Sequence, residues 1–89
     1  MEAKHLYLIS RENVVEARGF LALDPSAAVL VCGRGLLLPA NLFGKREIYA
    51  IAEEVSAFGL TGKLPEEVKI KNAEEILELI KNSKVFNFA

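Results

Sequence analysis

Residues 27–32 read Ala-Ala-Val-Leu-Val-Cys, and Gly33-Arg34-Gly35 closes this run. It is uncharged and mostly aliphatic, and it does not alternate between apolar and polar residues. An uninterrupted apolar run of this kind is typical of a strand buried on both faces, as in a parallel sheet. We therefore expect it to form the central strand of a parallel sheet, or the strand next to it.

Strand-like and helix-like segments alternate on both sides of this run. Strands are predicted at residues 6–9, 27–32, 46–51, 68–71 and 85–88. Helices are predicted at residues 11–23, 52–58 and 73–81, and Pro39 reduces residues 36–43 to a short helix or two turns. Such β-α-β units impose a parallel sheet with right-handed crossovers.

Polar residues mark the starts of two of these helices. Ser10 precedes the first helix and is expected to cap it. Asn72 and Glu75 have the spacing of a capping box at the start of the last helix. The apolar residues of that helix are expected to share one face: Ala73, Ile76, Leu77 and Ile80.

The size and composition of the chain predict one domain with an apolar excess. A chain of 89 residues is long enough for a single domain, over residues 1–89. Hydrophobic residues make up 52% of it, although a domain of this size has only a small interior. Two explanations stay open, because a parallel sheet covered on both faces is unusually apolar and a subunit interface also needs apolar surface.

The charge pattern and the single cysteine argue against several classes of function. The net charge is −1 with no basic stripe, so we expect no direct binding of nucleic acid. No apolar stretch reaches the ~20 residues of a membrane helix, and no signal peptide is visible before the first strand. The lone Cys32 excludes an intrachain disulfide and a cysteine zinc cluster. We expect a cytoplasmic protein with no cofactor and no metal.

The glycine turn after the strand at residues 27–32 is the first candidate site. Ligands of open α/β sheets bind at the carboxyl ends of the strands, where Gly33, Arg34 and Gly35 lie. A dinucleotide-binding G-x-G-x-x-G is incomplete, because Leu38 stands at the third glycine position. The turn therefore either lets the chain leave the sheet or binds an anion through Arg34 and nearby N–H groups.

Cys32 and His5 are the residues that could carry chemistry. Cys32 either reacts as a thiolate assisted by Arg34 or packs as a small apolar residue after three aliphatic ones, and we favour packing. His5 is the only histidine and is expected to be solvated, without a catalytic partner.

The segment after the glycine turn is a candidate interface. It holds more large apolar side chains than a small core requires. The candidate interface residues are Leu36, Leu37, Leu38, Leu42 and Phe43. Burial in the chain's own core is the other interpretation, but we favour contact with a partner subunit or with a second copy of the chain.

Residues 48–62 combine a strand, an acidic pair and a short helix that ends at glycine, Ile-Tyr-Ala-Ile-Ala-Glu-Glu-Val-Ser-Ala-Phe-Gly-Leu-Thr-Gly. This string resembles the DsrH/TusB family of sulfur-relay subunits. Members of the family carry a Val-Tyr-Ala-Leu-like strand, an acidic pair, and a short helix ending in Ala-x-Gly-Leu. The resemblance continues through residues 68–70, residues 74–80 and the aromatic tail at Phe88, and residues 29–36 are similar to the family's apolar strand and its turn.

The resemblance implies a DsrE/F/H-like fold, a three-layer α/β/α arrangement with a short, mainly parallel sheet of about five strands. It implies DsrE-like and DsrF-like partner subunits, in complexes that pass persulfide sulfur toward tRNA wobble 2-thiouridine or within sulfur oxidation. An H/B-type subunit mainly completes such an assembly. Residues 11–23 lack the first-helix cysteine of some members, and Cys32 stands where the family has an apolar residue, so no catalytic cysteine carries over. The alternatives are a stand-alone sulfurtransferase that uses Cys32 and a homo-oligomeric domain that binds a small ligand.

Overall fold

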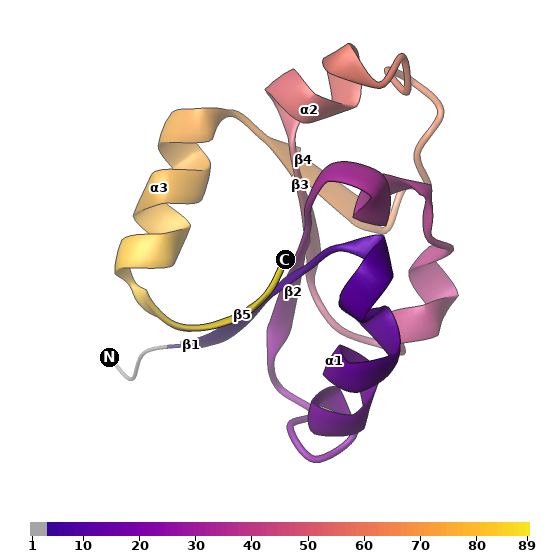
Figure 1. Ribbon diagram of the computed structural model, residues 1–89. Coiled ribbons are helices and arrows are strands. Elements are labelled where there is room, and N and C mark those ends of the chain that lie inside the picture. Colours follow the sequence, from indigo (N-terminus) through magenta and orange to yellow (C-terminus); the bar gives the residue numbers. More distant parts are fainter. Residues whose placement is uncertain (1–3) are drawn as a thin grey trace.

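The computed structural model describes residues 4–89 of the chain. The expectation that no signal peptide is present rests partly on residues 1–3, which lie outside the described residues. The strands are β1 Lys4–Ile9, β2 Ala28–Val31, β3 Ile48–Ile51, β4 Val68–Lys71 and β5 Ser83–Phe88. The α-helices are α1 Val14–Leu21, α2 Ala52–Ala57 and α3 Ala73–Lys81 (Figure 1). Three short 3₁₀ helices complete the description: η1 Arg11–Asn13, η2 Gly33–Leu37 and η3 Ala40–Phe43.

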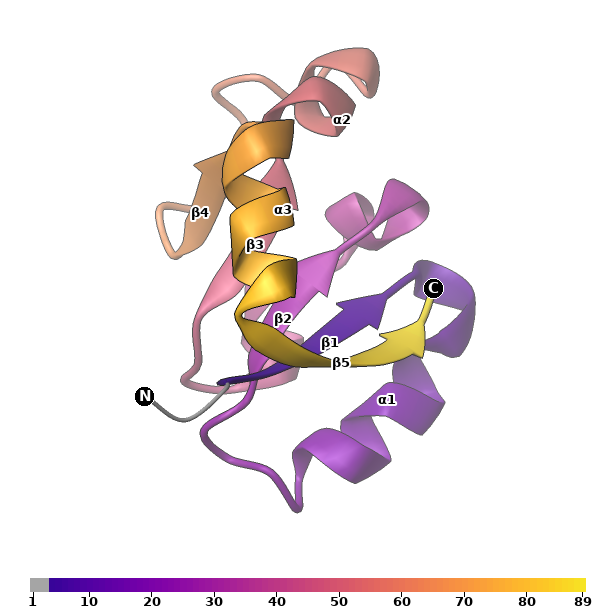
Figure 2. The same cartoon turned by 90° about the vertical axis from the view of Figure 1, so that its left-hand side faces the viewer.

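The five strands form one sheet in the order β4-β3-β2-β1-β5, and every neighbouring pair is parallel. The apolar run at residues 27–32 gives β2, which lies at the centre of the sheet with all four residues buried. The prediction that this run forms the central strand of a parallel sheet, or the strand next to it, is therefore confirmed. Strands β4 and β5 form the two borders of the sheet (Figure 2).

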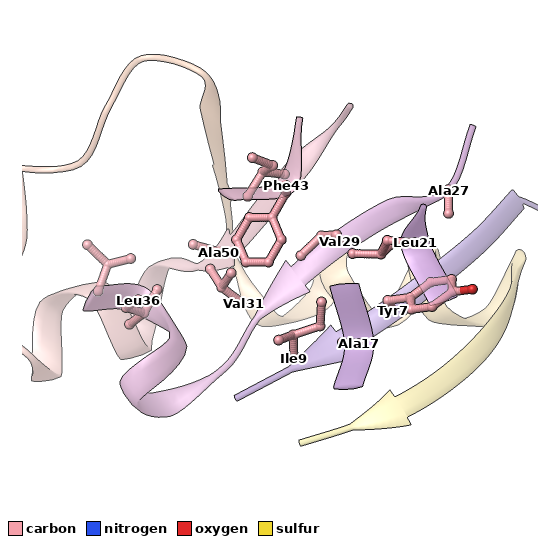
Figure 3. Packing of buried hydrophobic residues seen from close by; sticks show 12 residues of the cluster. Tyr7, Ile9, Ala17, Leu21, Ala27, Val29, Val31, Leu36, Phe43 and Ala50 are labelled. Carbon is pink, nitrogen blue, oxygen red and sulfur yellow. The ribbon is translucent and has the colours of Figure 1, made fainter. Parts of the chain in front are cut away.

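The helices cover both faces of the sheet, which confirms the three-layer α/β/α class (Figure 1). Helices α1 and α2, with η2 and η3, lie over one face, which we call the α1 face. Its buried side chains come from three strands, from α1 and α2, from η2 and η3, and from the loop before β2. They are Tyr7, Ile9, Ala17, Leu21, Ala27, Val29, Val31, Leu36, Phe43, Ile48, Ala50 and Val55 (Figure 3). Because strand side chains alternate, neighbouring residues of the same strands point to the other face.

Helix α3 alone covers that other face, which we call the α3 face. Its buried cluster is smaller and consists of Leu6, Ala28, Leu30, Tyr49 and Ile76. The predicted capping box is confirmed, because the Asn72 side chain accepts from the Glu75 N–H and the Glu75 side chain accepts from the Asn72 N–H. This cap fixes where α3 begins after β4.

Two local predictions are wrong. Ser10 makes no capping hydrogen bond, and its hydroxyl instead donates to the carbonyl oxygen of Phe88 at 3.4 Å, next to the Ser10 N–H. Leu77 and Ala73 do not belong to the packed face of α3, because Leu77 is 57% exposed and Ala73 is also exposed. Leu79 is instead half-buried against the sheet. Within residues 4–89, no helix has the length and apolarity to cross a membrane.

Candidate functional site

The carboxyl edge of the sheet brings together the residues that the sequence singled out. Cys32 follows the last residue of β2, and the turn of η2 begins directly after it. Helix α2 starts at the same edge, because β3 lies beside β2 and runs in the same direction. This places Glu54 of α2 next to Cys32 and Gly33.

The Cys32 thiol is held in its protonated form. The side chain is half-buried on the α3 face, and its Sγ donates to the carbonyl oxygen of Leu30 at 3.6 Å. Burial, and then the negative charge of Glu54, raise the pKa of Cys32 to about 11. Roughly one thiol in ten thousand is then ionised at pH 7. A nucleophilic or persulfide-carrying cysteine needs the opposite shift of its pKa.

The glycine turn is already filled by a carboxylate. The N–H of Gly33 lies 3.3 and 3.4 Å from the two carboxylate oxygens of Glu54, to which it donates. An external anion would have to displace Glu54 to reach this N–H. The Arg34 side chain is exposed to solvent.

Gly35 has a packing role in the same turn. A Cβ at this position would lie 2.6 Å from the backbone oxygen of Ile9. The Gly35 N–H donates to the carbonyl oxygen of Cys32 at 2.8 Å. A glycine is therefore required for η2 to lie against the end of β1.

The candidate interface segment divides into core and surface. Leu36 and Phe43 are each only 4% exposed and belong to the core of the α1 face. Their side chains therefore stabilise this chain's own fold and are not available to a partner. Leu38 and Leu42 are half-buried against that core. Leu37 is 54% exposed and is the residue of this segment that offers apolar surface to a partner.

At the amino end of the sheet, His5 has a partner that the sequence did not indicate. It lies in β1, and its Nδ1 is 2.6 Å from an Asp24 carboxylate oxygen, to which the Tyr7 hydroxyl also donates at 3.3 Å. The His5 ring lies edge-on to the ring of Phe86. The His5 side chain is 41% exposed, as expected for a solvated histidine. Its contact with Asp24 arises because the loop after α1 returns Asp24 to the start of β1. Cys32 lies at the opposite end of the sheet, so the two do not form a catalytic pair.

A second polar cluster at the amino end centres on Glu47. Its carboxylate accepts from Lys4 and from the Tyr49 hydroxyl, and Lys69 lies 3.4 Å away. The hydrogen bonds from Lys4 and Tyr49 lower the pKa of Glu47 to about 2. Burial, and then Glu47, raise the pKa of Tyr49 to about 12.

An open cavity of about 380 Å³ lies between the Tyr49 ring and α3. It is lined by Tyr49, Lys71, Glu75, Glu78, Leu79 and Asn82. Lys71 and Glu75 approach each other to 3.8 Å at this cavity, so two of its charges are partly paired. In residues 4–89, no group of three or more His, Cys, Asp or Glu side chains could hold a metal ion.

Arg46 stabilises the amino end of the α1 face. Its guanidinium donates to the carbonyl oxygens of four residues at 2.6–3.1 Å: Leu21, Asp24, Ala27 and Phe43. It also lines a cavity of about 400 Å³ beside Lys45 and Glu67. Because four of its five N–H donors are already used within the chain, Arg46 has little capacity left for a ligand.

The geometry therefore gives a protonated cysteine and a carboxylate-filled turn at one edge, and two internally paired polar clusters at the other. None of these arrangements is an assembled catalytic centre in the described part of the chain. No protein-family model matches the chain, and a search of curated proteins finds no match to it.

Proposed function

We propose that this chain is a non-catalytic accessory subunit of a DsrEFH/TusBCD-like sulfur-relay complex. It would support persulfide transfer that takes place on cysteines of DsrE-like and DsrF-like partner subunits. The transferred sulfur would serve tRNA wobble 2-thiouridine synthesis or sulfur oxidation. The resemblance of residues 48–62 to the DsrH/TusB family and the parallel three-layer fold both support this proposal.

The observation that carries the proposal is the state of Cys32. It is the only cysteine of the chain, and its pKa of about 11 leaves almost no thiolate at neutral pH. Attack on a persulfide needs a thiolate that a donor and an acceptor can both reach. This chain resembles the DsrH/TusB family but has no such thiolate, which supports the role of a subunit that completes the assembly without carrying sulfur itself.

The two alternatives have less support from the geometry. A stand-alone sulfurtransferase would need Cys32 to ionise, which its burial and Glu54 both oppose. A ligand-binding domain that uses the turn of Gly33 to Gly35 would need its N–H groups to be free, but Glu54 accepts from Gly33 and Cys32 accepts from Gly35.

The test is reconstitution with purified DsrE-like and DsrF-like subunits. We expect a stable complex that contains all three chains, with sulfur from a radiolabelled persulfide donor appearing on the partner subunits and not on this chain. Cys32→Ala should form the same complex and retain sulfur transfer.

Leu37→Lys provides an interface variant, and Leu23→Lys is its matched control. Both replace one exposed leucine on the surface of the α1 side, but Leu23 lies outside the segment of η2 and η3. The Leu37 variant should weaken the complex and the Leu23 variant should not. Absence of any complex, or persulfide label that accumulates on Cys32, would contradict the proposal.

A further inference from the structure

Strand β5 leaves one whole side of its backbone without a partner in the described structure. It pairs with β1 over six residues, from Ser83 to Phe88, and forms the border of the sheet (Figure 2). It contains no proline and no bulge, and Lys84 is its only charged residue. The Lys84 ammonium lies over the ring of its own strand neighbour Phe86, 5.6 Å from the centroid. The usual devices that protect an edge strand are therefore mostly missing here.

The free hydrogen-bonding groups of β5 belong to alternate residues. The N–H of Ser10 donates to the carbonyl oxygen of Phe88, so the backbone groups of Phe88 point toward β1. In a parallel ladder, the N–H and C=O of one residue point to the same side, and the side alternates along the strand. The N–H and C=O groups of Ser83, Val85 and Asn87 therefore point away from the sheet.

The other border of the sheet is different. Strand β4 has only four residues, and two of them are lysines, Lys69 and Lys71, whose side chains are about half exposed. Charged side chains on a short edge strand oppose the addition of another strand. The contrast singles out β5 as the edge that is open to pairing.

The outward-facing residues of β5 are symmetric about Val85. If two copies pair antiparallel around an axis through Val85, Val85 meets the second copy's Val85 and Ser83 meets the second copy's Asn87. By symmetry Asn87 also meets the second copy's Ser83, which makes three pairs of outward-facing residues. At two backbone hydrogen bonds per pair, they would exchange about six. Val85 is 38% exposed and would bury this apolar surface against itself.

The same register suits the other side chains of the strand. Lys84 would lie opposite the second copy's Phe86, and a cation over an aromatic ring is the contact that it already makes within its own chain. The register centred on Lys84 would instead set two ammonium groups directly opposite each other. The register centred on Phe86 would leave Ser83 opposite Ala89, outside the strand.

We propose that this chain forms a symmetric homodimer through antiparallel pairing of β5 with β5 of a second copy, centred on Val85. The product is one continuous sheet of twice the number of strands, with α1 helices on one face and α3 helices on the other. This inference stands on the β5 edge alone and does not depend on a role in sulfur transfer.

The first test is amide hydrogen exchange of the unmodified protein, measured by NMR at several protein concentrations. The amides of Ser83, Val85 and Asn87 should become protected as the concentration rises, whereas those of Lys84, Phe86 and Phe88 should be protected throughout. Light scattering should give a dimer at micromolar concentration. A protein that stays monomeric at about 100 µM, well above the micromolar range expected for this dimer, would overturn the proposal. Pairing of β5 only with a strand of another protein would overturn it too.

The second test uses variants of the edge. Val85→Pro removes an N–H that the chain's own sheet does not use, so it should leave the fold intact while raising the dimer dissociation constant about 100-fold or more. Val85→Ala is the matched control, since it shortens the same side chain and keeps the N–H, and it should weaken the dimer much less. If the proline variant fails to fold, Val85→Lys tests the same contact by setting two ammonium groups opposite each other.

A cross-link tests the register. In a Cys32→Ala background, Val85→Cys should form an intermolecular disulfide on mild oxidation, because hydrogen-bonded partners in antiparallel strands have Cα atoms about 5.5 Å apart. Ser83→Cys should not, because the two Ser83 positions would be about 13 Å apart along the paired strands. A dimer that survives Val85→Pro, or that cross-links only through position 83, would overturn the proposal.

Discussion

The two faces of the sheet differ in how completely they are sealed. The α1 face has twelve buried residues, supplied by three strands, two α-helices, η2, η3 and the loop before β2. The α3 face has five, and α3 contributes only Ile76 to them. Most of the apolar burial that stabilises the fold is therefore on the α1 face, because the hydrophobic contribution grows with the area removed from water.

The faces also differ in the groups that can titrate. Three groups with shifted pKa values lie on the α3 face: Glu47, Tyr49 and Cys32. On the α1 face, burial and then Asp24 raise the pKa of Tyr7, and Arg46 is bound to backbone carbonyl oxygens. The groups with the largest pKa shifts therefore lie on the less completely covered face. The sealed face should respond chiefly to changes in packing.

The largest effect is expected from Phe43→Ala on the α1 face. Phe43 is 4% exposed, so the substitution leaves a cavity in the larger core and should lower the free energy of unfolding by about 3–5 kcal/mol. Denaturant titration measures this change. Leu37→Ala, a few residues away and exposed, is the control and should change stability by less than about 0.5 kcal/mol.

A smaller effect is expected on the α3 face. Ile76→Ala removes the one buried residue of α3 and should cost about 2–3 kcal/mol, toward the lower end for a buried isoleucine. The surrounding Leu79 and Ile80 are only half-buried, so the helix can move to fill part of the space. If Ile76→Ala costs more than Phe43→Ala, the ranking of the two faces is wrong.

The sequence predicted the parts of the fold that depend on local pattern. Uninterrupted apolarity identified β2 as the central strand or its neighbour, and the spacing of Asn72 and Glu75 identified the start of α3. The packed face of α3 was only partly predicted. Apolar residues at positions 76, 77, 79 and 80 form two overlapping stripes on a nine-residue helix, and only the sheet decides which stripe packs.

The polar clusters could not be predicted in the same way. His5 and Asp24 are 19 residues apart, and Lys4 and Glu47 are 43 apart. The loop after α1 and the register of the strands bring these pairs together, and neither is visible as a short motif. The position of Cys32 at the end of β2 was predictable, but its contact with Glu54 required the packing of α2 beside η2.

The Glu47 cluster makes part of the stability depend on pH. Its pKa is lowered from 4.5 to about 2, so its contribution is complete above pH 4.5 and is lost as the pH falls through that range toward 2. Because 37% of the Glu47 side chain is exposed, solvent screening limits the loss to about 1 kcal/mol. Urea titrations at pH 6 and pH 3 measure it, and Glu47→Gln should reduce the difference between them. An unchanged difference in this variant would show that other carboxylates cause the loss.

The smallest change in stability is expected from Cys32→Ala. The side chain is half-buried, and the substitution removes a single sulfur atom together with a weak hydrogen bond to Leu30. The free energy of unfolding should fall by less than about 1 kcal/mol. A loss above about 2 kcal/mol would mean that Cys32 contributes more to the core of the α3 face than its half-buried position indicates.

The most direct test of the account is the pH dependence of alkylation at native Cys32. A thiol with a pKa of about 11 should react with iodoacetamide at a rate that rises up to that pH, and at pH 7 its rate should be about 100-fold below that of the unfolded chain. Mass spectrometry of the modified protein follows both rates. A midpoint near or below pH 8.5, with fast labelling of the folded protein at pH 7, would contradict the protonated, non-catalytic role of Cys32.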